Sequence, residues 1–241
     1  VASWDSEEPG SKDFYQIFDG TSFAAPVTTG GLALLQELYK SYHNNFMLAS
    51  TLKGLACHTA DDIRFWESAD DIIGPDAKTG FGMLNLEKAA VLIMDDATSN
   101  TAIYEQQLEN LGSKELYISL DESVENLTVT LSWNDPQLIN LSSEITLMHD
   151  LDVRVTQGET VHYPWKLDAA NLNLSATKGD NIVDNIEKIE VDNPSAGSYT
   201  ITINHKGTLA ENQSYSLLVS VDGEAPTLST NASLVLTKQQ L

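Results

Sequence analysis

The stretch Asp19–Pro26, which reads Asp-Gly-Thr-Ser-Phe-Ala-Ala-Pro, opens the segment that decides the fold of the first part of the chain. The residues that follow, from Ser22 to about Tyr39, are small or apolar on nearly every side. A helix without a polar face is surrounded by other structure, so we predict a buried helix here. Further helices are predicted around residues 50–59 and 85–94, which makes residues 1–95 mostly helical.

The second part of the chain has the period of β-strands. In residues 127–133, for example, Leu, Val, Leu and Trp alternate with Thr, Thr and Ser. We predict an all-β antiparallel sandwich domain over residues 96–222, and a linker or tail over 223–241. The expected strands lie around 116–120, 127–133, 147–156, 160–165, 186–192, 198–205 and 214–221.

Charge and composition exclude several classes of partner. The 241 residues include 13 basic and 35 acidic side chains, a formal net charge of −22. Such a field repels nucleic acid and anionic membrane surfaces, so we expect neither as a partner. Cys57 is the single cysteine, which excludes an internal disulfide. The chain begins at Val1 rather than at Met, which we interpret as the start of a processed or excised fragment.

Ser22 is the candidate nucleophile. A serine that attacks a carbonyl needs a tight backbone approach, which a nearby glycine allows, and amides aimed at the developing oxyanion. The start of a helix supplies free N–H groups and the positive end of the helix dipole. Pro26 is compatible with such a helix if it falls in the first turn. The alternative is that Ser22 only caps the helix, since serine is favoured at that position for ordinary reasons.

The first part of the chain resembles the subtilisin family of serine peptidases. Gly20–Pro26, with Gly-Thr-Ser-x-Ala-x-Pro, is similar to the family's active-site serine motif, and Gly80–Asn85 stands where the family has a Gly-x-Gly turn ending in Asn. Val1–Trp4 resembles the strand before the serine loop. The resemblance implies an incomplete α/β segment over residues 1–95, a mostly parallel sheet flanked by helices, with Ser22 as the catalytic serine.

The second part is similar to the C-terminal β-sandwich of certain bacterial alkaline subtilases, and more distantly to the P-domain of proprotein convertases. This resemblance implies a jelly-roll-like sandwich and a secreted, extracellular protein. The residues that carry it are Leu131–Pro136, Asp150–Val153, Asn181–Val191 and Pro194–Ile203.

The rest of the family's catalytic machinery is missing from this chain. In the family a histidine takes the proton of the serine and a carboxylate orients the histidine, and both lie upstream of the serine. The resemblance therefore implies a serine endopeptidase that hydrolyses polypeptide substrates through an acyl-enzyme on Ser22, with the triad Asp and His and an oxyanion Asn supplied by an upstream segment. This chain alone is expected to be inactive. Every histidine lies downstream of Ser22 and none precedes Gly-Thr: His43, His58, His149, His162 and His205.

Two other classes of function stay open. One is a binding module whose sandwich recognises protein or glycan, and the other is a non-catalytic structural fragment. An intact triad upstream of Ser22 would argue against the binding module, and the mass of the chain on a denaturing gel, compared with the encoded length, would separate these readings.

Asp135, Asp150 and Asp152 are candidate ligands of a structural calcium ion. Calcium prefers six to eight hard oxygen ligands, and Asp150 and Asp152 share one strand face. The related sandwiches are often stabilised by calcium. The alternative is a solvated row of carboxylates with Arg154 as a partner on the same face. Cys57 and the adjacent histidine are interpreted as an ordinary helix end, because no further ligand has zinc spacing, and no organic cofactor is expected.

Overall fold

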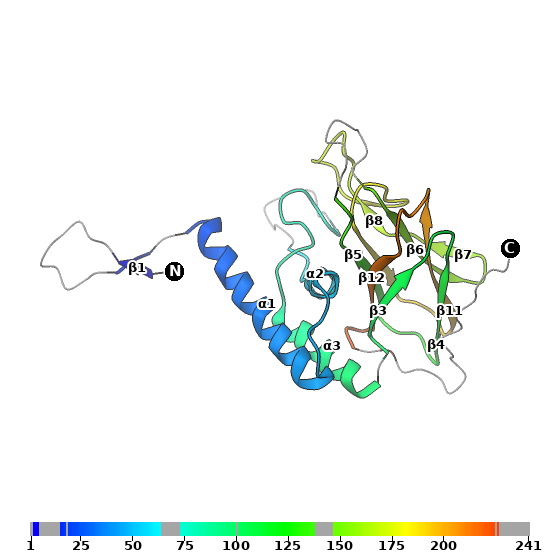
Figure 1. Ribbon diagram of the computed structural model, residues 1–241, viewed down its shortest axis with the longest axis horizontal. Coiled ribbons are helices and arrows are strands. Elements are labelled where there is room, and N and C mark those ends of the chain that lie inside the picture. The colour runs from blue at the N-terminus through cyan, green and yellow to red at the C-terminus, as the bar shows by residue number, and fades with distance from the viewer. Residues whose placement is uncertain are drawn as a thin grey trace, which may run out of the picture.

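The computed structural model describes residues 2–4, 15–17, 19–63, 73–99, 101–137, 147–224 and 226. Three helices form one side of the molecule: α1 (Thr21–His43), α2 (Ala49–His58) and α3 (Leu86–Ser99). They lie beside the strands of the second part of the chain (Figure 1). The predicted tail at 223–241 lies outside the described residues except for 223, 224 and 226.

Two four-stranded antiparallel sheets are formed by strands between residues 103 and 221, a region that we call the two-sheet unit. The first sheet has the order β10-β5-β12-β3, with β10 at Ile186–Asp192, β5 at Asn126–Trp133, β12 at Gln213–Val221 and β3 at Ile103–Leu108. The second has the order β4-β11-β6-β7, with β4 at Lys114–Leu120, β11 at Gly197–Lys206, β6 at Asp150–Gln157 and β7 at Thr160–His162. Two short strands, β8 (Trp165–Lys166) and β9 (Thr177–Lys178), form a separate pair.

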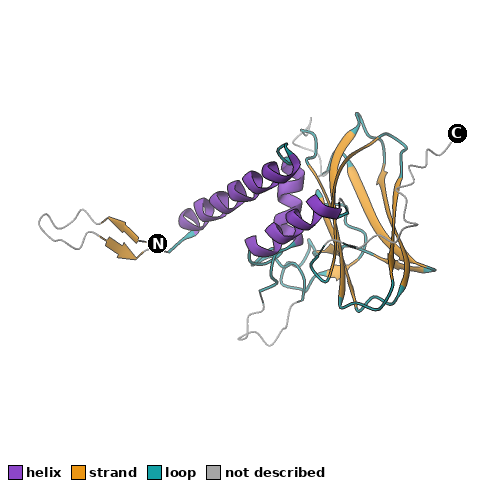
Figure 2. Cartoon of the chain, turned by 90° about the horizontal axis from the view of Figure 1, so that it is seen from below, coloured by secondary structure: helices purple, strands orange, loops and turns teal. Residues whose placement is uncertain are grey.

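The inner faces of the two sheets share one hydrophobic core. Leu131 of β5 and Tyr215 of β12 belong to the same buried cluster as Val153 of β6 and Ile201 of β11. These residues follow the predicted period of two, because successive side chains of a strand point to opposite faces. In Figure 2 the helices lie on the outer side of one sheet. The first sheet is therefore covered on both faces.

The helices have a core of their own, which reaches the first sheet. It contains Leu35 of α1, Leu55 of α2, Leu92 of α3 and Leu218 of β12. Helix α2 approaches the sheet closely, since a Cβ at Gly54 would lie 2.7 Å from the Leu218 side chain. Packing through Leu218 joins the helical part to the two-sheet unit.

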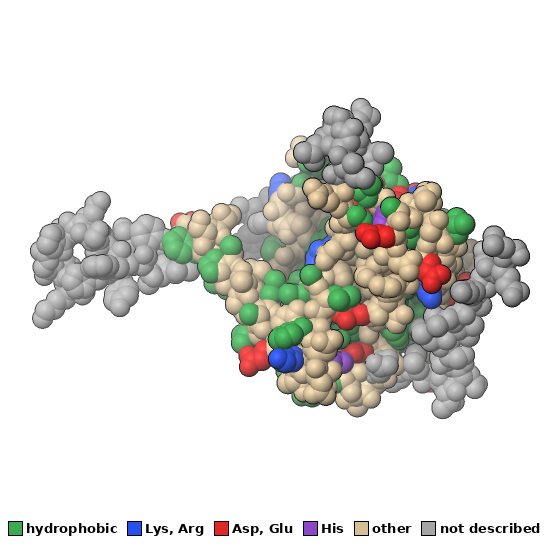
Figure 3. Space-filling model, in the orientation of Figure 1, with side chains coloured by type: hydrophobic (Ala, Val, Ile, Leu, Met, Phe, Trp, Pro, Cys, Tyr) green, Lys and Arg blue, Asp and Glu red, His purple; other side chains and the backbone are tan. Residues whose placement is uncertain are grey.

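Helix α1 differs from the prediction of burial on every side. Its buried residues are Gly31, Leu35 and Tyr39, a single stripe that faces α3 and α2. Residues 24–30 are all exposed, and hydrophobic side chains are visible along this helix in Figure 3. The described chain supplies neighbours for one face of the helix only.

The predicted parallel sheet is not formed by the described residues before α3. The strands there are β1 (Ala2–Trp4) and β2 (Tyr15–Ile17), which pair antiparallel, with Ser3 opposite Gln16. A parallel pair needs a crossover connection of a dozen or more residues. The strand expected at residues 1–4 is present as β1, but its described partner is an antiparallel neighbour.

Candidate active site

Ser22 is the second residue of α1 and is exposed to solvent. Gly20 stands just before the helix with φ 142°, a backbone conformation that favours glycine. Its carbonyl accepts hydrogen bonds from the N–H groups of Phe23 and Ala24, at 3.0 and 3.2 Å. The N–H groups of Thr21 and Ser22 have no acceptor within the helix, as is usual for a first turn. They can therefore act on a group bound in front of the helix.

Pro26 is the sixth residue of α1, beyond the first turn in which the sequence placed it. In a regular helix the sixth residue would donate its N–H to the carbonyl of Ser22. Proline has no N–H, so the Ser22 carbonyl lacks this helical hydrogen bond. The prediction that Pro26 falls in the first turn was wrong by one turn, because the helix begins at Thr21 and continues through the proline.

The described residues do not assemble a triad around Ser22. His43 lies at the opposite end of α1, about 30 Å along the helix axis from Ser22. His58 and His149 are buried, and their hydrogen bonds go to residues of the two-sheet unit. The remaining two histidines lie on β7 and β11. The assignment of Ser22 as nucleophile stays a prediction.

Helix α2 is attached to the first sheet by polar contacts that the sequence did not reveal. His58 is buried, and its ring nitrogens lie 2.8 Å from the Thr130 hydroxyl and 2.9 Å from the Ser220 hydroxyl. Burial lowers the pKa of His58 to about 3, and the nearby Lys188 ammonium acts in the same direction. His58 is therefore a neutral ring that joins α2 to β5 and β12.

Lys53 makes a second attachment on the same helix. Its ammonium donates hydrogen bonds to the carbonyl of Trp133 at 2.8 Å, and to the carbonyl and side-chain oxygen of Asn185, each at 2.9 Å. Burial lowers the pKa of Lys53. The lysine thus joins α2 to the last residue of β5 and to the residue that precedes β10.

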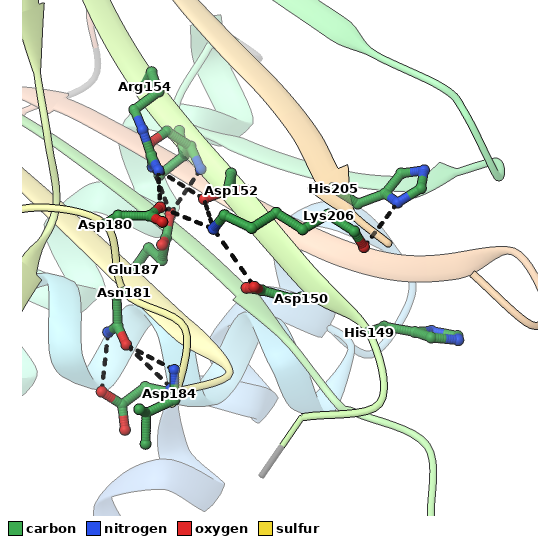
Figure 4. A network of polar contacts seen from close by, with 12 residues as sticks. His149, Asp150, Asp152, Arg154, Asp180, Asn181, Asp184, Glu187, His205 and Lys206 are labelled. Atoms are coloured by element: carbon green, nitrogen blue, oxygen red, sulfur yellow. Dashed lines mark hydrogen bonds and ion pairs between the residues drawn. The ribbon is translucent and has the colours of Figure 1, made fainter. Parts of the chain in front are cut away.

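Two of the predicted calcium ligands, both on β6, belong to a cluster of charges that also includes residues of β10 and of the loop before it (Figure 4). We call the side chains of Asp150, Asp152, Asp180 and Glu187 the acidic cluster. Lys206 and Arg154 lie among them. The Lys206 ammonium is 2.7 Å from Asp152, 2.8 Å from Asp180 and 3.4 Å from Asp150.

Arg154 contacts the other side of the acidic cluster. Its guanidinium is 2.7 Å from Asp152, pairs with Asp180 and lies 3.4 Å from Glu187. The sequence anticipated Arg154 as a partner of Asp152 on one strand face. It did not anticipate Lys206, which comes from the neighbouring strand β11.

The acidic cluster contains two buried oxygens without a partner among the described residues, Asp150 Oδ1 and Glu187 Oε1. Burial raises the pKa of Glu187 to about 8, although the hydrogen bond from the Val153 N–H acts against this. Burial also raises the pKa of Asp150. For Lys206, burial lowers the pKa, but hydrogen bonds to the carboxylates outweigh it and raise the pKa overall.

Asp135, the third predicted calcium ligand, makes a different set of contacts. Its two carboxylate oxygens accept hydrogen bonds from the N–H groups of Met148 and His149, at 2.7 and 2.8 Å. Within the described part of the chain, no group of three or more His, Cys, Asp or Glu side chains is arranged to hold a metal ion. The three predicted ligands thus do not meet at one point in this arrangement. Calcium binding stays a prediction.

Comparison with known proteins identifies the class of the helical part. Residues 3–89 match the model of the subtilase family, and they include Ser22. This part of the chain is a subtilisin-like fragment.

A curated relative extends the match beyond the fragment. The chain is 26% identical over 222 residues to the serine protease/ABC transporter B family protein tagA of Dictyostelium discoideum. The match covers 85% of this chain, so it includes residues of both the helical part and the two-sheet unit, but it covers only 12% of the relative. The chain therefore spans about an eighth of that protein.

Two solved structures share weak likeness with the chain. The mitogen of Yersinia pseudotuberculosis gives a TM-score of 0.31 at 17% identity, over 59% of this chain and 99% of its own. CorA, a copper-binding protein of Methylomicrobium album, gives 0.29 at 12% identity, over 51% and 94%. Both scores are too low to establish a common fold. No helix in the described ranges is long and apolar enough to cross a membrane.

Proposed function

We propose that the chain carries the nucleophile of a subtilisin-like serine endopeptidase, and that peptide-bond hydrolysis proceeds through an acyl-enzyme on Ser22. The observation that carries the proposal is the position of Ser22, exposed at the start of α1 within the segment that matches the subtilase family. In the first step, Ser22 Oγ attacks the substrate carbonyl as a base accepts its proton. The Ser22 N–H would then bind the oxyanion, a contribution of about 10²–10³ in rate for one such donor.

The base, the acid that orients it and a further oxyanion donor would come from an upstream segment of the same protease. Two observations support this part of the proposal. The described histidines lie away from Ser22, and residues 24–30 of α1 offer an uncovered surface beside the serine. Val27 and Leu34, 69% and 63% exposed, are apolar side chains that such a segment would cover.

The two-sheet unit would be the jelly-roll-like sandwich of an extracellular protease that acts on polypeptides. The antiparallel sheets with one shared core support the sandwich, and the relative that matches both parts of the chain, a serine protease by its name, supports the protease. A net charge of −22 supports the expectation that neither nucleic acid nor a membrane surface is a partner.

The test uses the longer protease that includes the upstream segment. Ser22→Ala should lower casein hydrolysis by about 10⁶-fold and abolish labelling by a fluorophosphonate. Ser41→Ala is the matched control, because Ser41 is exposed on the same helix and its hydroxyl donates a hydrogen bond to the Leu38 carbonyl of that helix. This chain alone should show neither hydrolysis nor labelling. Retained activity in Ser22→Ala would contradict the assignment of the nucleophile. A longer protein that shows neither hydrolysis nor labelling with Ser22 intact would favour a binding module or a structural fragment.

A further inference from the structure

Two loops of the two-sheet unit enclose a pocket of about 310 Å³, which we call the loop pocket. One loop joins β8 to β9 and the other joins β9 to β10, and every described lining residue lies between 166 and 184. The apolar part of the lining consists of Leu167, Ala169, Leu172, Ile182 and Val183. The volume is at the low end of the roughly 300–1,000 Å³ that is typical of ligand pockets. The loop pocket therefore fits one or two side chains rather than a folded element.

The apolar side chains of the loop pocket are exposed to solvent. Leu172 is 53% exposed, Ile182 58% and Val183 46%. Ile182 and Val183 lie in a turn held by the buried Asn181, whose amide donates a hydrogen bond to Asp184 at 2.9 Å and whose oxygen accepts the Val183 N–H at 3.1 Å (Figure 4). Exposed apolar side chains gathered around a hollow, with polar residues at its rim, are typical of a surface that another molecule covers.

The rim of the loop pocket is acidic. Asp184 belongs to the lining, and Asp168 lies between two lining residues; both are exposed. The hydrogen bonds that these two carboxylates accept come from uncharged groups, a backbone N–H and a side-chain amide. The lining also contains Lys166 and Asp180, which carry opposite charges. Asp168 and Asp184 are therefore available to a positively charged group that lies next to an apolar one.

The charge of the whole chain narrows the classes of occupant. A formal net charge of −22 repels nucleic acid, anionic membrane surfaces and a second copy of this chain, which carries the same charge. A polypeptide segment that contains Lys or Arg is attracted instead. We propose that the loop pocket binds an extended polypeptide segment. An apolar side chain of the segment is seated between the two loops, and an adjacent Lys or Arg pairs with Asp168 or Asp184.

The loop pocket is separate from Ser22 but borders the helical part. The start of α1 points away from the two-sheet unit (Figure 1, Figure 2). Trp165, which precedes the first lining residue, packs against Gly74, where a Cβ would lie 3.0 Å from the indole ring. In the protease proposed above, the loop pocket would hold a polypeptide substrate away from the bond that is cleaved. This role rests on the proposed function, whereas binding of the segment does not.

The experiment titrates this chain with short fluorescent peptides and follows fluorescence polarisation. One peptide has a leucine between two lysines in a Gly-Ser background, a second has alanine in place of the leucine, and a third has glutamates in place of the lysines. The leucine peptide should bind about 10- to 100-fold more tightly than the alanine peptide, because one leucine side chain is buried. It should also bind more tightly than the glutamate peptide, by a factor that shrinks at high salt. Binding requires neither Ser22 nor the upstream segment, so this result is independent of the test of hydrolysis.

A variant of the loop pocket separates binding at this place from binding elsewhere on the chain. Ile182→Ser should weaken binding of the leucine peptide about 10-fold and leave the urea midpoint of unfolding unchanged, because the side chain is exposed. Leu111→Ser is the matched control, since Leu111 is exposed on the turn between β3 and β4. It should bind like the unaltered chain. If Ile182→Ser does not fold, Leu172→Ser, on the other loop, takes its place in the titration.

Three results would overturn the proposal. One is equal affinity for the leucine and alanine peptides, or unchanged binding by a folded loop-pocket variant. Another is equal affinity for the lysine and glutamate peptides at low salt, because charge then does not select the segment. The third is a dimer of the unaltered chain in analytical ultracentrifugation that Ile182→Ser abolishes, since the occupant is then a second copy.

Discussion

Acidification should weaken the packing of α2 on the first sheet, because His58 is buried there as a neutral ring. The ordinary pKa of histidine is about 6.5, and in the folded chain the pKa of His58 is lowered to about 3. Between these values the unfolded chain takes up a proton that the folded chain does not. The stability is therefore intact above pH 6.5 and falls progressively as the pH drops toward 3.

The size of the effect follows from the two pKa values. A difference of this size corresponds to about 5 kcal/mol when the titration is complete, and to about 3 kcal/mol at pH 4.5. The hydrogen-bond partners of the His58 ring are the hydroxyls of Thr130 and Ser220. Neither hydroxyl carries a negative charge that would stabilise a protonated ring. The charged groups that line the neighbouring cavity of about 280 Å³ are Lys88, Lys188, Glu125, Glu190 and Asp222.

The assay compares the free energy of unfolding in urea at pH 7.5 and 4.5, for the unaltered chain and for His58→Gln. Glutamine can donate a hydrogen bond to one hydroxyl and accept one from the other, but it does not titrate. The difference between the two proteins should change by about 3 kcal/mol between the two pH values. His162→Gln, on the short edge strand β7, should give a smaller change. An equal difference at both pH values would refute the reasoning, since a buried neutral histidine must show this dependence.

Two further predictions concern the same junction and the turn at Gly80–Asn85. Lys53→Met should lower the free energy of unfolding by about 2 kcal/mol in the same urea assay, because the Trp133 and Asn185 carbonyls lose a charged donor. Lys78→Met, the control at an exposed turn, should have little effect. Gly82→Ala should lower it by more than about 2 kcal/mol, because Gly82 has φ 114° and a Cβ would lie 2.1 Å from the Asp61 carbonyl oxygen. Gly80→Ala should lower the free energy of unfolding by only about 1–2 kcal/mol, since Gly80 has φ 63° and open space around its Cα. Equal losses of stability at the two glycines would contradict the close approach at Gly82.

Periodicity predicted most elements, because helices and strands place their buried side chains at different intervals. The strand at 186–192 agrees with β10 to the residue, and the helix predicted from Ser22 agrees with α1 within one residue at its start. Strand β3 was missed because its residues, Ile-Tyr-Glu-Gln-Gln-Leu, do not alternate clearly. Its outer residue Glu105 instead accepts hydrogen bonds from Leu48 and Thr51 beside α2.

The buried polar contacts of α2 and of Lys206 were not readable in this way, because they depend on which segments meet. Thr130, Ser132, Ser216 and Ser220 lie at the polar positions of β5 and β12, a pattern equally typical of a face in water. All four are buried, since α2 covers this face and offers hydroxyls and a histidine to it. The contact of Lys206 with Asp152 was not readable either, because the two residues are 54 positions apart along the chain. Only the register of β11 against β6 turns a cluster of aspartates that looked like a metal site into one that already contains its cation.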